Sequence, residues 1–202
     1  MKLSCLDFLG ISEHFSEEEI MVQKTANEFV VKEVMPIIDE HFENNTFPAE
    51  IVQELGKVGF LGPTIPEEYG CSGMSSIAYG LICQELERGD SGLRSFASVQ
   101  GSLAMYPIWD FGSEEQKEKY LKPLCEGKGT SCFAMTEPEV AGSDPTLIRT
   151  TGYQDGEEWV INGHKWFISN AHRAQFAILI SRTEDNPDLP QAANTAFIVD
   201  LP

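Results

Sequence analysis

The sequence has few basic residues, and this shortage excludes several kinds of partner. Lysine and arginine number 14 against 32 aspartates and glutamates, a formal charge of −18 over 202 residues. Nucleic-acid binding needs a basic surface, so no nucleic-acid partner is expected. An anionic membrane surface is disfavoured for the same reason, and no apolar run is long enough to imply membrane insertion. We expect most of the acidic surplus to lie on solvated helix faces.

Sites built on cysteine, histidine or a known catalytic turn are also not indicated. The five cysteines form no Cys-x-x-Cys pair, which favours reduced thiols in a cytoplasmic protein. The four histidines lack metal-ligand spacing, so no metal site is expected. The acidic N-terminal segment does not match a targeting peptide. There is no Gly-x-Gly-x-x-Gly, P-loop or Gly-x-Ser-x-Gly motif. Any nucleotide is therefore bound without a Rossmann or P-loop turn.

Residues 1–129 have the periodicity of amphipathic helices. Apolar residues recur every three or four positions over 15–38, where Ser16 and Glu19 match a capping box. Pro36 is expected to kink or end this helix. Four further helices are expected, over 49–60, 75–88, 93–111 and 114–127.

Residues 130–202 change to the period-two pattern of strands. Asp155-Gly156 and Asn162-Gly163 are hairpin signals because these residue types tolerate positive φ. The pattern predicts an α+β fold, with an all-helical domain at 1–129 followed by an antiparallel β domain at 130–202. Six strands are expected, over 130–135, 146–153, 158–162, 165–169, 175–181 and 195–201.

Two irregular segments of the β half form the candidate site. TEPEVAGSD, residues 136–144, follows an expected buried strand, and its small residues and hydroxyls suit a phosphate or the polar edge of a heterocycle. KWFISN, residues 165–170, places two aromatic rings and a hydroxyl beside a turn. Taken singly, each segment has a simpler structural explanation. The first is a strand exit with an Asx-type turn at Ser143-Asp144, and the second is one buried ring beside a half-exposed ring.

Taken together after a helical half, the two segments resemble the flavin segments of the acyl-CoA dehydrogenases. TEPEVAGSD is similar to the first, NGHKWFISN is similar to the second, and GSEEQKEKYLKPLCEG is similar to the helix that leads into the first. The resemblance implies a helical N-terminal domain, a β-barrel-like middle domain and a C-terminal helical domain, with FAD between them. It implies that FAD accepts a hydride during α,β-dehydrogenation of a short acyl-CoA.

The resemblance also implies roles for particular residues. The Thr136 backbone and hydroxyl meet the pyrimidine edge of the ring, and Ser143 reaches the pyrophosphate and the substrate. Ser169 bonds near flavin N5. Phe167 and Ser169 replace the family's usual Trp and Thr, and residues 139–141 hold one residue more than the common spacing. The expected cofactor-binding residues are Phe133, Met135, Thr136, Gly142, Ser143, Phe167, Ile168 and Ser169.

The family's catalytic base is a glutamate of the C-terminal helical domain, whereas this chain stops at Pro202, inside the β half. We therefore assign no catalytic residue within it, and Glu85, Glu87 and Glu137 are not given that role. Three explanations stay open. The chain is part of a longer enzyme, or a second chain completes it, or it is a catalytically incomplete fragment that acts as an interaction module. Residues 1–202 alone are expected to bind FAD poorly and to be inactive. The complete enzyme is expected to be a homo-oligomer with an electron-transfer flavoprotein-like acceptor.

ELERGDSGLRS, residues 85–95, bears on the substrate. Gly89 suits a helix end and Asp90 or Ser91 a cap, so Arg94 lies near a helix start, where an anion is favoured. From spacing alone, pairing of Arg94 with an acid such as Asp90 is the simpler explanation. With SVQGSLAMYPI after it, the segment resembles the glutaryl-CoA dehydrogenase branch, where the matching residues hold or lie near a distal carboxylate. We therefore expect a short dicarboxylyl-CoA, the alternatives being a non-dicarboxylic acyl-CoA or an acyl-ACP. The expected substrate-binding residues are Glu87, Arg94, Ser95 and Ser143.

Overall fold

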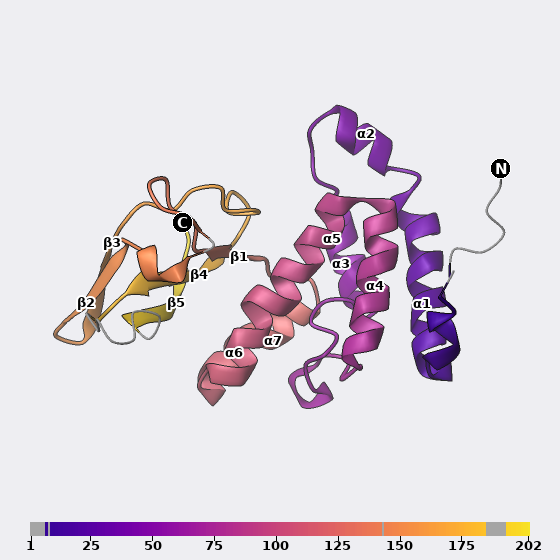
Figure 1. Ribbon diagram of the computed structural model, residues 1–202, viewed down its shortest axis with the longest axis horizontal. Helices are drawn as coiled ribbons and strands as arrows, with labels where there is room; N and C mark the ends of the chain where they lie inside the picture. The colour runs from indigo at the N-terminus through magenta and orange to yellow at the C-terminus, as the bar shows by residue number, and fades with distance from the viewer. Residues whose placement is uncertain (1–6, 8, 143, 185–192) are drawn as a thin grey trace.

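In the computed structural model, which describes residues 7, 9–142, 144–184 and 193–202, a helical part precedes a five-stranded sheet (Figure 1). This order confirms the predicted α+β fold. The helices are α1 (Glu17–Phe29), α2 (Ile38–Glu43), α3 (Glu50–Lys57), α4 (Ser76–Gly89), α5 (Ser91–Ser98), α6 (Tyr106–Phe111) and α7 (Glu114–Cys125), with π-helical segments η2 (Val30–Val34) and η4 (Val99–Met105) and short 3-10 turns η1 (Ile11–His14), η3 (Glu67–Tyr69) and η5 (Pro145–Leu147).

Side-chain caps fix the start of four helices. The Ser16 side chain accepts a hydrogen bond from the Glu19 backbone N–H, and the Glu19 carboxylate accepts one from the Ser16 backbone N–H, so the predicted capping box is present. Ser113 forms the same box with Gln116 at the start of α7. Ser75 and Asp90 cap α4 and α5. These starts depend on local residue order, which explains why the sequence predicts them well.

A π-helical segment joins α5 to α6, and the region predicted as one helix over 93–111 is indeed helical throughout. The segment η4 contains Gln100, whose side chain is only 1% exposed. π-Helical turns inside longer helices often lie at functional sites. Here the π-helical turn places the buried side-chain amide of Gln100 in contact with Ser131 of the sheet.

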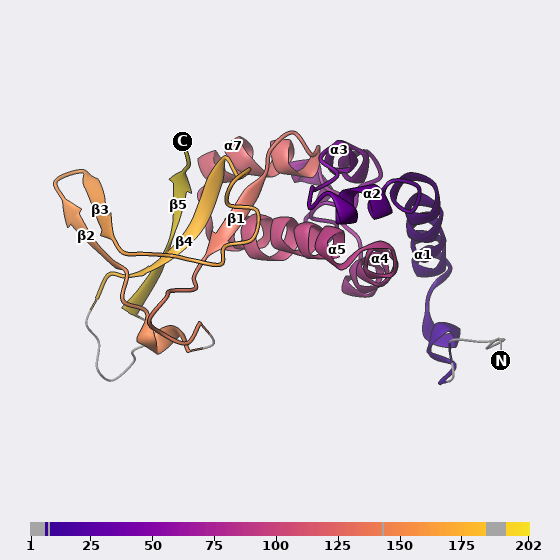
Figure 2. The same cartoon turned by 90° about the horizontal axis from the view of Figure 1, so that it is seen from above.

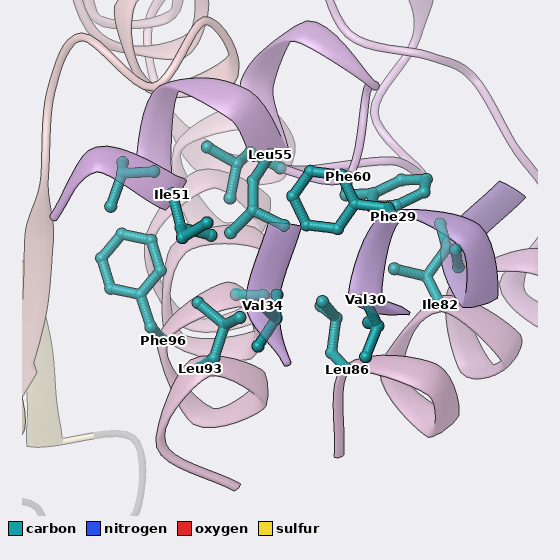
Figure 3. Close-up of a cluster of buried hydrophobic side chains, with 14 of the residues drawn as sticks. Phe29, Val30, Val34, Ile51, Leu55, Phe60, Ile82, Leu86, Leu93 and Phe96 are labelled. Carbon is teal, nitrogen blue, oxygen red and sulfur yellow. The ribbon is translucent and has the colours of Figure 1, made fainter. Parts of the chain in front are cut away.

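The helical part is held by a dense apolar core between α1, α3, α4 and α5, in which Phe29 and Phe60 meet edge to face with ring centroids 5.8 Å apart (Figure 3). Burial of such side chains stabilises the fold by about 1.5–3 kcal/mol each. The predicted three- and four-residue spacing therefore corresponds to a real buried face.

The sheet is mixed rather than purely antiparallel, which corrects the prediction. Its central strand β4 pairs antiparallel with β5, but parallel with β1 and, at Arg182, with β2. Residues 135–175 connect β1 to β4, and a connection this long allows the chain to return in the same direction. The hairpin β2–β3 is antiparallel, as Asp155-Gly156 predicts. The strands are β1 (Ser131–Ala134), β2 (Thr151–Asp155), β3 (Glu158–Asn162), β4 (Phe176–Arg182) and β5 (Asn194–Asp200).

The strand predicted over 165–169 is wrong. Residues 163–170 form an irregular segment, and the backbone has positive φ at Phe167 (52°) and Asn170 (68°). A strand requires extended backbone, so these two left-handed residues are incompatible with a strand in this segment. The strand predicted over 146–153 begins only at Thr151, because residues 145–147 form the short turn η5.

A second apolar core joins the helical part to the sheet. Met105, Leu121 and Leu124 from the helices lie in one cluster with Phe176 and Ile178 of β4. The hairpin β2–β3 projects at the end of the molecule away from α1 (Figures 1 and 2). No helix within the described residues is long and apolar enough to cross a membrane.

Candidate functional site

The two irregular segments lie side by side against the end of β1. The Trp166 backbone N–H donates to the Thr136 carbonyl at 3.1 Å, and Lys165 Nζ donates to the Met135 carbonyl at 2.9 Å. At the far end of the second segment, Asn170 Nδ2 donates to the Ser131 carbonyl at 3.0 Å. The second segment is thus fastened along β1 by direct hydrogen bonds.

A buried ion pair beneath the segments holds them together. Lys165 Nζ lies 2.8 Å from Glu137 Oε1, and the two side chains are only 9% and 5% exposed. Thr150 and the Arg149 backbone N–H also donate to the Glu137 carboxylate. Burial raises the pKa of Glu137, but the hydrogen bonds from Lys165 and Thr150 outweigh it, so the pKa is lowered from 4.5 to about 2. Glu137 is therefore a fixed anion, which does not suit a proton-accepting base at neutral pH.

Two aromatic rings of the second segment face outward. Phe167 is 80% exposed and Trp166 is 40% exposed, with ring centroids 4.4 Å apart. The simpler explanation, with one ring in the core, is therefore wrong. Ile168 instead supplies the apolar contact, packing against the small cluster around Cys132 and Ala177. An exposed ring on left-handed backbone suggests a binding surface rather than core packing.

The first segment makes a tight turn beside Thr136. A Cβ added at Gly142 would lie 3.2 Å from Thr136 Oγ1, which leaves little room for a larger residue. Asp144 accepts hydrogen bonds from the Thr146 backbone N–H at 3.0 Å and from its hydroxyl, forming the Asx-type turn. Ser143, predicted to contact both cofactor and substrate, lies outside the described residues.

A cavity of about 360 Å³ lies between α5 and the second segment. Ser95, Val99 and Phe96 line one side, and Ser169 and Arg173 line the other. The structure therefore brings the predicted substrate residue Ser95 close to the predicted cofactor residue Ser169. A separate hollow of about 380 Å³ is lined by Glu137, Thr150 and Trp166. The segment that carries Phe167 thus borders two hollows.

Arg94 and Glu87 pair with each other. Arg94 Nε lies 2.6 Å from Glu87 Oε2, and Arg94 also donates to the Ser98 hydroxyl at 3.3 Å. The hydrogen bond from Arg94 lowers the pKa of Glu87. Asp90, the partner expected from spacing, instead caps α5 by accepting from the Leu93 N–H at 2.7 Å.

The residues present fit the polar and aromatic edges of a flavin. The hydroxyls of Thr136, Ser169 and Ser95 donate no hydrogen bond to any residue that the structure describes, so all three are available to a ligand. Phe167 offers an exposed ring next to Ser169. Phe133 is half-buried against the core shared with the helices and positions the strand itself.

Two models of known protein families together match nearly the whole chain. The model of the acyl-CoA dehydrogenase N-terminal domain matches residues 16–128, and that of the middle domain matches residues 132–202. The chain belongs to the acyl-CoA dehydrogenase family. The predicted boundary at 129/130 falls between α7 and β1.

Three relatives illustrate the range of this family. The 3-(aryl)acrylate reductase of Clostridium sporogenes is 37% identical over 92% of this chain and 48% of its own length. The human mitochondrial short-chain specific acyl-CoA dehydrogenase is 36% identical, over 92% of this chain and 44% of its own. The structure of a glutaryl-CoA dehydrogenase from Mycobacterium smegmatis in complex with FADH2 is 38% identical, with a TM-score of 0.87, over 95% of this chain and 47% of that one. The chain thus spans about half the length of these relatives.

Several residues that organise the site are not apparent from the sequence. Glu137 lies in the first motif and Lys165 in the second. The presence of an acid and a lysine in two segments expected to lie together is the one sequence feature that could have predicted their ion pair. Gln100 contacts Ser131 through three hydrogen bonds, at 3.1, 3.2 and 2.8 Å, and no local pattern indicates this. Arg173 lies over the ring of Phe47, which is distant in sequence.

Proposed function

We propose that this chain forms the FAD- and acyl-CoA-binding part of a dehydrogenase that oxidises the α,β-bond of a short acyl-CoA. The observation that carries the proposal is the direct bonding of the two flavin-like segments, through Trp166 N–H and the Thr136 carbonyl, with Phe167 left exposed. Family membership supports it, as does a related structure solved with FADH2. FAD, when bound, supplies the hydride acceptor.

The chain's own residues have binding and orienting roles in this proposal. The hydroxyls of Thr136 and Ser169 satisfy polar atoms of the ring, and Phe167 packs against it. The buried Glu137–Lys165 pair keeps the two segments at a constant separation, so the ring is held without rearrangement. No catalytic base is proposed among residues 1–202. We propose an electron-transfer flavoprotein-like acceptor for the complete enzyme.

We further propose that the acyl group carries a distal carboxylate, as in glutaryl-CoA. The closeness of Ser95 to Ser169 supports this, because the predicted carboxylate-binding residue shares a cavity with a predicted flavin residue. The relatives also include enzymes named for short-chain acyl-CoA and for 3-(aryl)acrylate. A monocarboxylic acyl-CoA is therefore the alternative to test.

The flavin part is tested at the full length of the protein in which this sequence occurs, by titrating FAD into the wild type and into Thr136→Val and Ser169→Ala variants, with Thr25→Val on α1 as control. Each site variant removes one hydroxyl and leaves a polar ring atom unpaired, at a cost of about 1–3 kcal/mol. We expect weaker FAD binding, or altered flavin absorption, in both site variants and no change in the control. If both site variants bind FAD as the wild type does and show the same flavin absorption, the ring does not lie against Thr136 and Ser169.

The substrate part is tested at the full length of the protein in which this sequence occurs. Anaerobic bleaching of the flavin is followed with glutaryl-CoA and with butyryl-CoA. We expect faster bleaching with glutaryl-CoA. A preference for butyryl-CoA would reject the dicarboxylyl substrate, and no bleaching by either would reject the dehydrogenase.

A further inference from the structure

Two buried thiols lie together where the loop between α3 and α4 meets the end of α7. Cys71 of the loop is 9% exposed and Cys125 of the helix is 4% exposed. Both belong to the apolar core that joins the helical part to the sheet, and both are free thiols in this structure. Neither residue has a role in the proposed dehydrogenase, so their closeness needs an explanation of its own.

A short hydrogen bond limits the distance between the two cysteines. Cys125 Sγ donates to the carbonyl oxygen of Gly70 at 2.8 Å, and Gly70 directly precedes Cys71. Standard backbone geometry places that oxygen about 3 Å from the Cys71 Cα, so Cys125 Sγ lies within about 6 Å of this Cα. Disulfides usually join cysteines whose Cα atoms are about 4.4–6.8 Å apart. A disulfide between the two residues therefore needs only a local adjustment.

The loop lies along the face of α7 that carries Cys125. Gly70 has left-handed backbone, with φ of 85°, and this turns the chain just before Cys71. A Cβ added at Gly70 would lie 3.5 Å from Cγ of Lys122, so the loop touches α7 at this position too. Lys122 and Cys125 are three residues apart and share one side of the helix. The loop thus meets α7 at two successive places.

Close packing against α3 fixes the position of Cys125. A Cβ added at Gly56 on α3 would lie 2.6 Å from the backbone carbonyl carbon of Glu126, the residue after Cys125. The two backbones therefore touch, and the end of α7 has no room to shift toward α3. A disulfide would instead draw the loop with Cys71 toward the helix.

The two thiols change each other's affinity for a proton. A hydrogen bond with Cys71 lowers the pKa of Cys125, although burial acts in the other direction. The same contact, followed by burial, raises the pKa of Cys71. Cys125 is therefore the thiol that ionises first, and a thiolate is the form that attacks an oxidant. Cys71 remains a protonated thiol beside it.

Two other buried or half-buried cysteines lack such a neighbour. Burial raises the pKa of Cys83, and the closest side-chain partner among its causes is Tyr79. Burial also raises the pKa of Cys132, whose sulfur approaches the Phe176 carbonyl at 3.9 Å. In the part of the chain that the structure describes, no second thiol affects either of them. They therefore serve as internal references for Cys71 and Cys125.

A hollow of about 510 Å³ lies beside the thiol pair. Its lining includes Tyr69, Gly70 and Lys122. Gly70 thus borders the hollow and also accepts the hydrogen bond from the Cys125 sulfur. A molecule as small as hydrogen peroxide therefore reaches the immediate surroundings of the pair.

We propose that Cys71 and Cys125 form a reversible redox site, in which a peroxide oxidises the two thiols to a disulfide that fastens the loop to α7. The Cys125 thiolate attacks one peroxide oxygen, the oxygen–oxygen bond breaks, and Cys125 becomes a sulfenic acid. The hydroxide that leaves takes up the proton released by Cys125. The Cys71 sulfur then attacks the sulfenic sulfur, and a second water leaves.

Overall, two thiols lose two electrons and two protons, and one hydrogen peroxide becomes two waters. A dithiol reverses the reaction by exchange and is itself oxidised to a disulfide. Disulfides of cytosolic proteins are usually transient and redox-sensing, which agrees with free thiols as the resting state. The redox site does not depend on the proposed function, because it needs neither flavin nor acyl-CoA.

The test treats the full-length protein in which this sequence occurs with hydrogen peroxide while it is folded. The remaining thiols are alkylated, the protein is digested without reduction, and the peptides are identified by mass spectrometry. We expect the peptides of Cys71 and Cys125 to be joined, with Cys83 and Cys132 alkylated. Dithiothreitol should return both thiols. The oxidised protein should also unfold at a higher urea concentration, because the bond restricts the unfolded chain.

Removal of one thiol tests the order of the two steps. In Cys71→Ala, the sulfenic acid on Cys125 has no thiol to resolve it. Labelling of Cys125 by dimedone, which reacts with sulfenic acids, should therefore be several-fold greater than in the wild type. Cys83→Ala is the matched control and should form the Cys71–Cys125 disulfide as the wild type does.

Three results would overturn the redox site, and all come from the wild type, so none depends on a variant that folds. One is that both thiols remain alkylated at a peroxide dose that oxidises the half-buried Cys83. Another is a disulfide that forms only in urea. The third is an oxidised protein that unfolds at a lower urea concentration, because the bond would then strain the native fold. Flavin bleaching is measured separately, so its failure would reject the dehydrogenase and leave the peptide map unaffected.

Discussion

The helical part and the irregular segments of the sheet part are held by different forces. Between α1, α3, α4 and α5, apolar side chains such as Leu55 and Ile82 are fully buried against one another. The segments 135–142, 144–150 and 163–170 are held together by Glu137, Lys165 and backbone hydrogen bonds. An apolar core loses stability gradually when one side chain is trimmed, whereas a buried ion pair fails when either partner is removed. The proposed ligand surface is therefore stabilised by the interaction that is less tolerant of substitution.

The largest expected effect is loss of one member of the buried pair. Glu137→Gln or Lys165→Met leaves an uncompensated buried group and should lower the free energy of unfolding by about 3–5 kcal/mol. Glu139→Gln is the matched control, since Glu139 lies two residues away and its ion pair with Arg149 is exposed on both sides. Urea unfolding measures all three. If Glu137→Gln costs no more than Glu139→Gln, the contrast between the two parts of the molecule is wrong.

Acid should weaken the same pair. The folded-state pKa of Glu137, about 2, lies below its ordinary value of 4.5, so its contribution is present above pH 4.5 and is lost as the pH falls toward 2. The lost contribution is about 3 kcal/mol. Subtracting the unfolding free energies of Glu137→Gln from those of wild type, at each pH, isolates this group from the other carboxyls. A difference that stays constant between pH 5 and pH 2 would contradict the lowered pKa.

The helical part was largely predictable because its signals are local. Ser16 with Glu19, and Ser113 with Gln116, lie within one helical turn of each other, so residue order alone identifies these starts. The irregular segments were proposed as a ligand surface from their small residues, hydroxyls and aromatic rings, and the resemblance to a family then favoured that interpretation over the simpler ones. Their conformation was not predicted, since left-handed Phe167 in a run of apolar residues has no local sequence signal. Apolar periodicity instead indicated a strand there.

The long-range polar contacts were beyond sequence reasoning for a related reason. Arg173 meets Phe47, and Gln100 meets Ser131, only after the helices and the sheet have packed together. The parallel pairing of β1 with β4 has the same origin, because it depends on the path of residues 135–175 rather than on either strand. Composition and spacing predict which face of a helix or strand is apolar, whereas these contacts depend on which elements pack against each other in the folded chain.

A smaller effect is expected at the contact between the two parts. Gln100→Leu removes three hydrogen bonds and leaves buried groups of Ser131 without partners, at a cost of about 1–3 kcal/mol. Hydrogen exchange of the β1 amides should become faster, because Ser131 begins that strand. Gln84→Leu, at an exposed position of α4, is the control. Unchanged exchange in β1 would mean that the amide does not fasten the helix to the sheet.

The smallest expected effect is the removal of one methylene group from the helical core. Ile82 on α4 is fully buried, so Ile82→Val should lower the free energy of unfolding by about 0.5–1.5 kcal/mol. Ile77→Val makes the same change on the same helix at a side chain that is 50% exposed, and should cost less than about 0.5 kcal/mol. Ile82 and Glu137 share no partner, so the double variant Ile82→Val/Glu137→Gln should show the sum of the two single losses within about 0.5 kcal/mol. A larger coupling, measured by the same urea unfolding, would mean that the apolar core and the polar pair stabilise one another. The helical part and the proposed ligand surface would then form a single cooperative unit, and they would not differ in their tolerance to substitution.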